Sequence, residues 1–144
     1  MKRISLLLLS ALLLFLFACN REKPAPKKTE NSQPIILSTT VAPNSAFKMS
    51  VAFDPPQPLM SKKTKFTLTV TAPSGAPVDG ATVKASLVMP LMDMGKNGFP
   101  LEAKGKGVYQ GDGQFTMSGE WEAIFTAEAA GKSGKTTFNV RVED

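Results

Sequence analysis

The chain has 144 residues, with no histidine, a single cysteine and a formal net charge of +5. Without histidine it cannot form a Ser–His–Asp triad, a Cys–His pair or an imidazole metal site. Of its 17 Lys and Arg residues, two fall in residues 1–3 and four in residues 20–33. Residues 34–144 contain the other 11, together with 10 of the 12 acidic residues, so this part of the chain has a net charge of +1. Because these lysines are scattered and not clustered, no nucleic-acid partner is indicated.

Residues 1–18 have the pattern of a signal peptide. Lys2 and Arg3 precede an apolar run over residues 4–17 that only two serines interrupt. The run of 14 residues is shorter than the roughly 20 residues that a spanning helix requires. Its length matches the apolar core of a signal peptide.

The leader ends in Leu16-Phe17-Ala18-Cys19, which resembles the lipobox of bacterial lipoproteins: Leu, a small residue, Ala or Gly, then Cys. Phe17 departs from the small residue of that pattern. The resemblance implies cleavage before Cys19 and diacylation through its sulfur, which becomes a thioether to a glyceryl group that carries fatty acids such as palmitate. The chain would then be lipid-anchored in the cell envelope, on the extracytoplasmic side of a membrane. An uncleaved anchor and an ordinary secretory cut are the alternatives.

Residues 19–33 are predicted to be the lipidated cysteine and a disordered tether. The segment after Cys19 is rich in Lys, Glu and Pro and has no large apolar residue, so it cannot bury a core. Residues 34–144 are predicted to fold as one domain.

The domain shows the residue alternation of half-buried β-strands, in which every second side chain is apolar. Clear alternation covers residues 46–53, 66–70, 120–127 and 137–142, and weaker strand candidates are 81–89, 99–104 and 109–117. Turns are predicted at 73–75, 79–80, 95–98, 111–113 and 131–134, and an extended linker or edge segment at 54–58. About seven short strands and no helical periodicity predict an all-β, immunoglobulin-like sandwich.

No catalytic arrangement is evident, which predicts that the protein is not an enzyme. No Gly-rich phosphate loop joins a predicted strand to a helix. The carboxylates occur singly except Glu120 and Glu122, which lie on the outward face of a predicted strand and are expected to be solvated.

The most informative segment is Val88-Met89-Pro90-Leu91-Met92-Asp93-Met94-Gly95, with Met117 as a fourth methionine further along. Thioether sulfur is a soft ligand that suits Cu(I) and discriminates against hard cations. Met92 and Met94 have the i, i+2 spacing, so in an extended segment both would point to one face. Met89 or Met117 could add a third sulfur.

Two other interpretations of these methionines remain open. Methionine is a flexible core filler, and Met89 continues the apolar row of residues 83, 85 and 87, while Met117 follows Phe115 on one face. Met92 and Met94 lie between Pro90 and Gly95, in a loop or edge segment. An exposed methionine loop could also be a protein-docking surface.

Five motifs of the domain together resemble the YtkA-like family and, more distantly, FixH-like proteins. They are Asp54-Pro55-Pro56, Gly75-Ala76-Pro77-Val78-Asp79-Gly80-Ala81, Met89-Pro90-Leu91-Met92-Asp93-Met94-Gly95, Gly107-Val108-Tyr109 and Phe115-Thr116-Met117-Ser118-Gly119-Glu120-Trp121. The resemblance covers residues 47–142 and implies an immunoglobulin-like sandwich in an exported protein linked to copper handling. It draws attention to Met89, Met92, Met94 and Met117. The chain departs from the family in having Met60-Ser61-Lys62-Lys63 in place of a Gly-containing turn.

Two functional hypotheses follow. The first is a non-catalytic, membrane-anchored lipoprotein that binds Cu(I) through Met92 and Met94, with Met89 and Met117 as further ligands. Copper-binding relatives often carry histidine near these positions, and its absence here favours Cu(I) over Cu(II). The second is a metal-free interaction domain that serves as an accessory part of an envelope protein complex.

Overall fold

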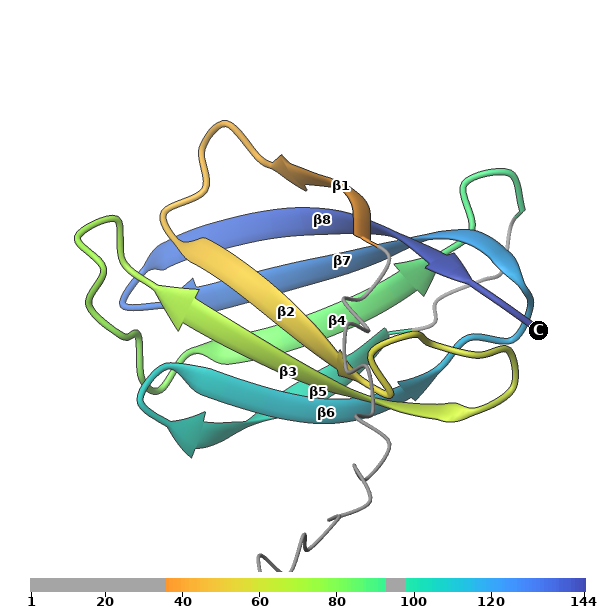
Figure 1. Cartoon of the computed structure of the whole chain (residues 1–144). Coiled ribbons are helices and arrows are strands. Elements are labelled where there is room, and N and C mark those ends of the chain that lie inside the picture. The colour runs from red at the N-terminus through yellow and green to blue at the C-terminus, as the bar shows by residue number, and fades with distance from the viewer. Residues whose placement is uncertain (1–35, 93–97) are drawn as a thin grey trace, which may run out of the picture. The chain divides into compact units, whose positions relative to one another are not determined.

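The computed structural model describes residues 36–92 and 98–144, which form eight antiparallel β-strands (Figure 1). The strands are β1 (Ile36–Val41), β2 (Lys48–Asp54), β3 (Lys63–Thr71), β4 (Thr82–Val88), β5 (Gly98–Gly105), β6 (Val108–Gln114), β7 (Gly119–Ala129) and β8 (Lys132–Val142). These two ranges contain no helix, and so none that could span a membrane. The predicted signal peptide, Cys19 and tether lie outside the described residues.

The sheet folds over at β5 into the two layers of a sandwich (Figure 1). The strand order is β1-β8-β7-β4-β5-β6-β3-β2. Residues 98–101 of β5 pair with β4, whereas residues 102–105 pair with β6. The predicted β-sandwich is confirmed, with eight strands where about seven were expected. The additional strand is β1, an edge strand whose side chains are mostly exposed and therefore show no apolar alternation.

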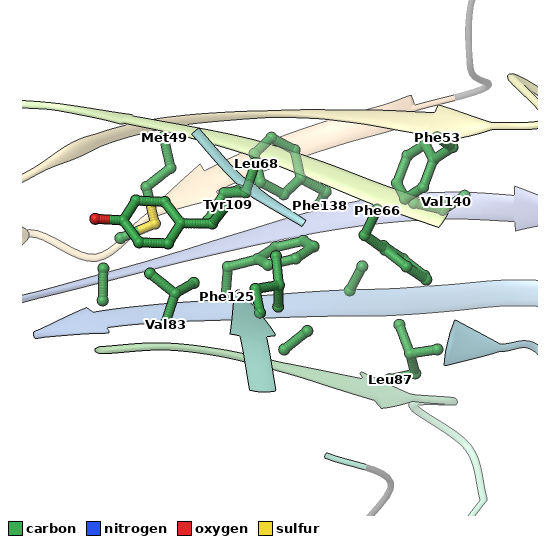
Figure 2. Close-up of a cluster of buried hydrophobic side chains, with 14 of the residues drawn as sticks. Met49, Phe53, Phe66, Leu68, Val83, Leu87, Tyr109, Phe125, Phe138 and Val140 are labelled. Atoms are coloured by element: carbon green, nitrogen blue, oxygen red, sulfur yellow. The ribbon is translucent and has the colours of Figure 1, made fainter. Parts of the chain in front are cut away.

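The core lies between the two layers and is centred on Phe66 of β3 (Figure 2). Its fully buried ring has centroid distances of 5.3 Å to Phe53, 5.2 Å to Phe99, 5.9 Å to Phe115 and 6.2 Å to Phe125. Such tilted and edge-on contacts stabilise aromatic cores beyond the area they bury. Because Phe53 and Phe66 belong to one layer and Phe125 to the other, this cluster holds the sandwich together.

The turn predicted at Gly111-Asp112-Gly113 is wrong, because these residues lie within β6. Gly111 and Gly113 pair with the inward-facing Phe66 and Thr64, so both face the core. A Cβ atom at Gly113 would lie 2.6 Å from the Phe99 ring and 2.9 Å from the Phe66 ring. The glycines therefore leave the space that Phe99 occupies where β5 crosses between the layers.

The turn predicted at residues 131–134 is correct only in part. The reversal before β8 is made by Ala130 and Gly131, both with positive φ, whereas residues 132–134 already belong to β8. Gly134 faces inward, where a Cβ atom would lie 2.8 Å from the Ser45 hydroxyl and 3.1 Å from Met49 Cε. A glycine that permits close packing inside a strand thus has the same local sequence signature as a turn glycine.

The turns predicted at residues 73–75 and 79–80 are confirmed; of the turn predicted at 95–98, residues 95–97 lie outside the described residues and Gly98 already belongs to β5. Gly75 and Gly80 have φ values of +89° and +70°, a conformation in which glycine carries no steric penalty. The segment they enclose is fixed to β6 by Tyr109, whose hydroxyl donates to the Val78 carbonyl and accepts from the Ala81 amide. Tyr109 and Trp121 are both buried, as expected.

Replacement of Gly113 by Ala should lower the free energy of unfolding by about 2 kcal/mol, because the added methyl group overpacks a core that has no space for it. Urea denaturation would measure the change. Gly98→Ala is the matched control: its Cβ atom would lie 3.4 Å from the nearest atom, an ordinary contact. Equal stability of the two variants would contradict the assigned role of Gly113.

Candidate metal site at the methionine end

Three connections meet at one end of the sandwich: residues 55–62 between β2 and β3, 89–97 between β4 and β5, and 115–118 between β6 and β7. We call this the methionine end, because five of the seven methionines of the chain belong to these connections: Met60, Met89, Met92, Met94 and Met117. Antiparallel pairing places them at the same end, with Val88 opposite Glu122 and Gly119 opposite Val142. The end lies on the right in Figure 1, where the C-terminus is marked.

Met89 continues the inward row of β4 but reaches the rim of the core. It is partly buried and packs against the core, so the expected burial is confirmed in part. Its Cε atom lies 3.4 Å from where a Cβ atom of Gly119 would be. Gly119 has a φ of +128°, which suits glycine, and its missing side chain leaves room for the Met89 methyl group.

A tight turn brings Met92 back toward Met89. The Met92 amide donates to the Met89 carbonyl at 3.0 Å, and the Met92 side chain is 48% exposed. Both methionines line one surface depression of about 640 Å³. Its other lining residues are Pro90, Leu91, Ser118, Gly119 and Glu120.

Met117 is held next to this depression by the aromatic core. The Trp121 indole Nε1–H donates to the Met117 carbonyl at 3.0 Å, and the Trp121 ring meets Phe115 edge-on, with centroids 5.4 Å apart. The side chain of Met117 is 38% exposed, so the interpretation of Met117 as core is wrong. Met117 itself does not line the depression, but the next residue, Ser118, does.

Met94 cannot be placed in the same way, because it belongs to residues 93–97, outside the described ranges. Three of the four predicted ligands, Met89, Met92 and Met117, therefore lie within the described residues. Met89 and Met92 share one depression, and Met117 lies beside it through its neighbour Ser118.

Met60 was not among the predicted site residues, yet it belongs to the same end of the domain. Its amide donates to the Glu143 carbonyl, and the amide of Ser61 donates to the Phe115 carbonyl, both at 2.7 Å. The Met60 side chain is 36% exposed. The sequence signal was only its position in a connection between strands, which does not reveal at which end the connection lies.

Charged groups at the site are few and solvated. Glu120 lines the depression, and its carboxylate pairs with Arg141 at 2.7 Å, with both side chains more than half exposed. Glu122 is half-buried rather than fully solvated. Within the described ranges, no three His, Cys, Asp or Glu side chains are grouped to hold a metal ion. Met89 and Met92 contribute thioether sulfurs to the depression, and such sulfurs are donors that suit soft cations.

The fold and the site define a small β-sandwich domain that carries exposed methionines at one end. The model of the YtkA-like family matches residues 45–126, more than half of the chain, and the protein belongs to this family. The matched range includes every methionine of the methionine end.

Similarity to other characterised proteins is low. No curated protein matches the sequence. One similar solved structure is the soluble domain of PmoD from Methylocystis sp. ATCC 49242 (Rockwell), with 12% identity and a TM-score of 0.43 over 71% of this chain and 95% of that chain.

Trp121→Phe should loosen the segment that carries Met117, since it removes the only indole donor to the Met117 carbonyl. Loss of this hydrogen bond, together with the cavity that replaces part of the buried indole, should lower the free energy of unfolding by about 2–3 kcal/mol. Hydrogen exchange of the peptide covering residues 115–120 should become several-fold faster. Tyr109→Phe, which removes a buried aromatic donor at the opposite end, should leave exchange of that peptide unchanged. Equal exchange in the two variants would contradict the anchoring role of Trp121.

Proposed function

We propose that this protein is a non-catalytic, membrane-anchored lipoprotein that binds Cu(I) at its methionine end and handles copper in the cell envelope. The observation that carries the proposal is the depression that Met89 and Met92 line together, with Met117 beside it. Met92 and Met94 are the first ligands, and Met89 and Met117 complete the set.

The chemistry of the donors supports a soft, monovalent metal. Thioether sulfur is neutral and polarizable, and it binds Cu(I) without first losing a proton. Cu(II) prefers nitrogen and oxygen donors in square-planar arrangements, and the chain has no histidine to provide them. The site is therefore suited to Cu(I).

The exposure of the methionines supports exchange of the metal with another carrier. Met92 is about half exposed, and Met117 is 38% exposed. By contrast, Met49 is a core residue with 9% exposure. Surface thioethers at the end of a rigid sandwich can receive a metal and release it again, which fits a protein that buffers copper or passes it on.

Anchoring of the protein rests on Cys19 and the leader before it. The motif Leu16-Phe17-Ala18-Cys19 provides the only cysteine of the chain at the position where acylation would occur. Two acyl chains are enough for stable membrane attachment. The copper site would thus be confined to the surface of one membrane.

A metal-free interaction domain is the second candidate, and the exposure of Leu91 favours it. Leu91 lies in the depression and is 96% exposed, yet it has no donor atom for a metal. In this alternative, the methionine end docks on another protein of an envelope complex through apolar contact.

The direct test is a Cu(I) titration of residues 20–144 under reducing, anaerobic conditions, in competition with a chromogenic chelator. One equivalent of Cu(I) should bind with a dissociation constant of about 1 μM or below, an order of magnitude that corresponds to about 8 kcal/mol. Replacing Met92 and Met94 together by Leu should abolish this binding, because Leu keeps the volume and removes the sulfur.

Met49→Leu is the matched control for that double variant. It removes one buried sulfur, should cost less than about 1.5 kcal/mol of stability, and should leave Cu(I) binding unchanged. Stoichiometric binding that survives in the Met92→Leu, Met94→Leu protein would refute the site. Absence of competition in the unmodified protein would favour the metal-free alternative.

The affinity for Cu(I) should be independent of pH between about pH 5 and 8, the range in which histidine ligands would titrate. Thioether ligands do not take up protons in this range, so the dissociation constant should vary less than about twofold. The same competition assay, repeated across the range with a correction for chelator protonation, measures this. A tenfold loss of affinity at the acidic end would show that a titrating group belongs to the ligand set.

A further inference from the structure

Exposed apolar side chains gather at the methionine end. Of the six large apolar side chains that are exposed in the described ranges, four belong to this end: Met60, Leu91, Met92 and Met117. Leu91 is the extreme case, because 96% of its side chain is exposed at the tip of a turn, next to the exposed Pro90. A fully exposed leucine at the same end as three exposed methionines is the kind of apolar surface that marks interaction sites.

Metal binding does not account for Leu91. Its side chain has no donor atom, and it extends away from the core that the inward row of β4 builds. Leaving it in water forgoes the free energy that burial of a leucine provides. Leu91 therefore requires a contact other than the metal.

The chain enters the domain at this same end. Ile36, the first residue of β1, pairs with Val140 of β8, and Val142 pairs with Gly119 beside the depression. Figure 1 shows β1 beginning on the side of the C-terminus. The segment that precedes the domain therefore meets it next to the methionine end.

The length of the preceding segment limits how far the domain can lie from its anchor. Residues 19–35 number 17, and 17 residues can span at most about 60 Å. With the acyl chains of Cys19 in a bilayer, the domain stays within about 60 Å of the membrane, and its connection to the anchor leaves from the end of the sandwich at Ile36.

We propose that the methionine end contacts the lipid bilayer and that Pro90, Leu91 and Met92 enter its interfacial layer. This inference rests on the lipid anchor of the proposed function and is independent of copper binding. A metal held by Met89 and Met92 would then be bound and released directly at the membrane surface.

The charges at this end indicate which lipids matter. Lys62 and Lys63 follow Met60, and Glu143 and Asp144 lie at the C-terminus, so neither sign dominates. The contact therefore depends on apolar insertion. It occurs on zwitterionic bilayers and changes little with added anionic lipid or salt.

The test uses the acylated protein purified from membranes and reconstituted without copper into phosphatidylcholine vesicles. The sulfur of acylated Cys19 is a thioether and does not react with thiol reagents, so a Leu91→Cys variant carries one reactive thiol for an environment-sensitive nitrobenzoxadiazole dye. Ser74→Cys, in the exposed turn at the opposite end of the sandwich, is the matched control. At position 91 the dye should show blue-shifted, several-fold stronger emission and several-fold weaker quenching by iodide than at position 74.

The possible failures are distinguishable. If the vesicles carry the protein but the dye at position 91 is as accessible to iodide as at position 74, the lipid contact is overturned and the anchor stands. If the dye at position 91 is shielded in native membranes but not in lipid vesicles, the contact is with a protein, which also overturns the inference. If Cys19 takes up dye and the protein does not float with the vesicles, the anchor fails and this inference fails with it.

Discussion

The packing of Phe66 is the contact on which the rest of the structure depends. Its ring touches aromatic residues from both layers and from the connection after β6, so it sets the distance between the layers and the position of that connection together. Phe115 in turn packs edge-on against Trp121, and the Trp121 indole donates a hydrogen bond to the Met117 carbonyl. The segment that carries Met117 is thus held in place by buried aromatic rings of the core.

The crossing of β5 between the layers was not predictable from local sequence. Apolar alternation identified β2, β3, β7 and β8, because one face of each is buried and the other is solvated. It could not identify which strands pair, since register depends on residues far apart in the chain. Glycines at 111 and 113 are typical of turns, and only the position of Phe99 above them explains why they belong to a strand.

The sequence predicted the type of donor atom at the candidate site, but it predicted only some of the residues that lie at this end. Composition alone pointed to thioether donors and to residues 89–94, because the chain has no histidine and only one cysteine. The exposure of Met117 was not predictable: the alternation of Phe115 and Met117 suggests one inward face, but the strand ends at Gln114 and the backbone turns. Met60 belongs to the same end through contacts between residues far apart in the sequence, such as the hydrogen bond from its amide to the Glu143 carbonyl and the pairing of Lys63 with Gln114.

Exposure to water has different consequences for a methionine and for a leucine on the same surface. A sulfur on the surface can be useful in water, because a soft metal can reach it there. A leucine in the same place gains nothing from water and gains free energy only when water is removed. Met92 and Leu91 are neighbours in one turn, so a surface that covers one affects the other. The proposed metal site and the proposed lipid contact thus share one turn, because Leu91 and Met92 line the same depression.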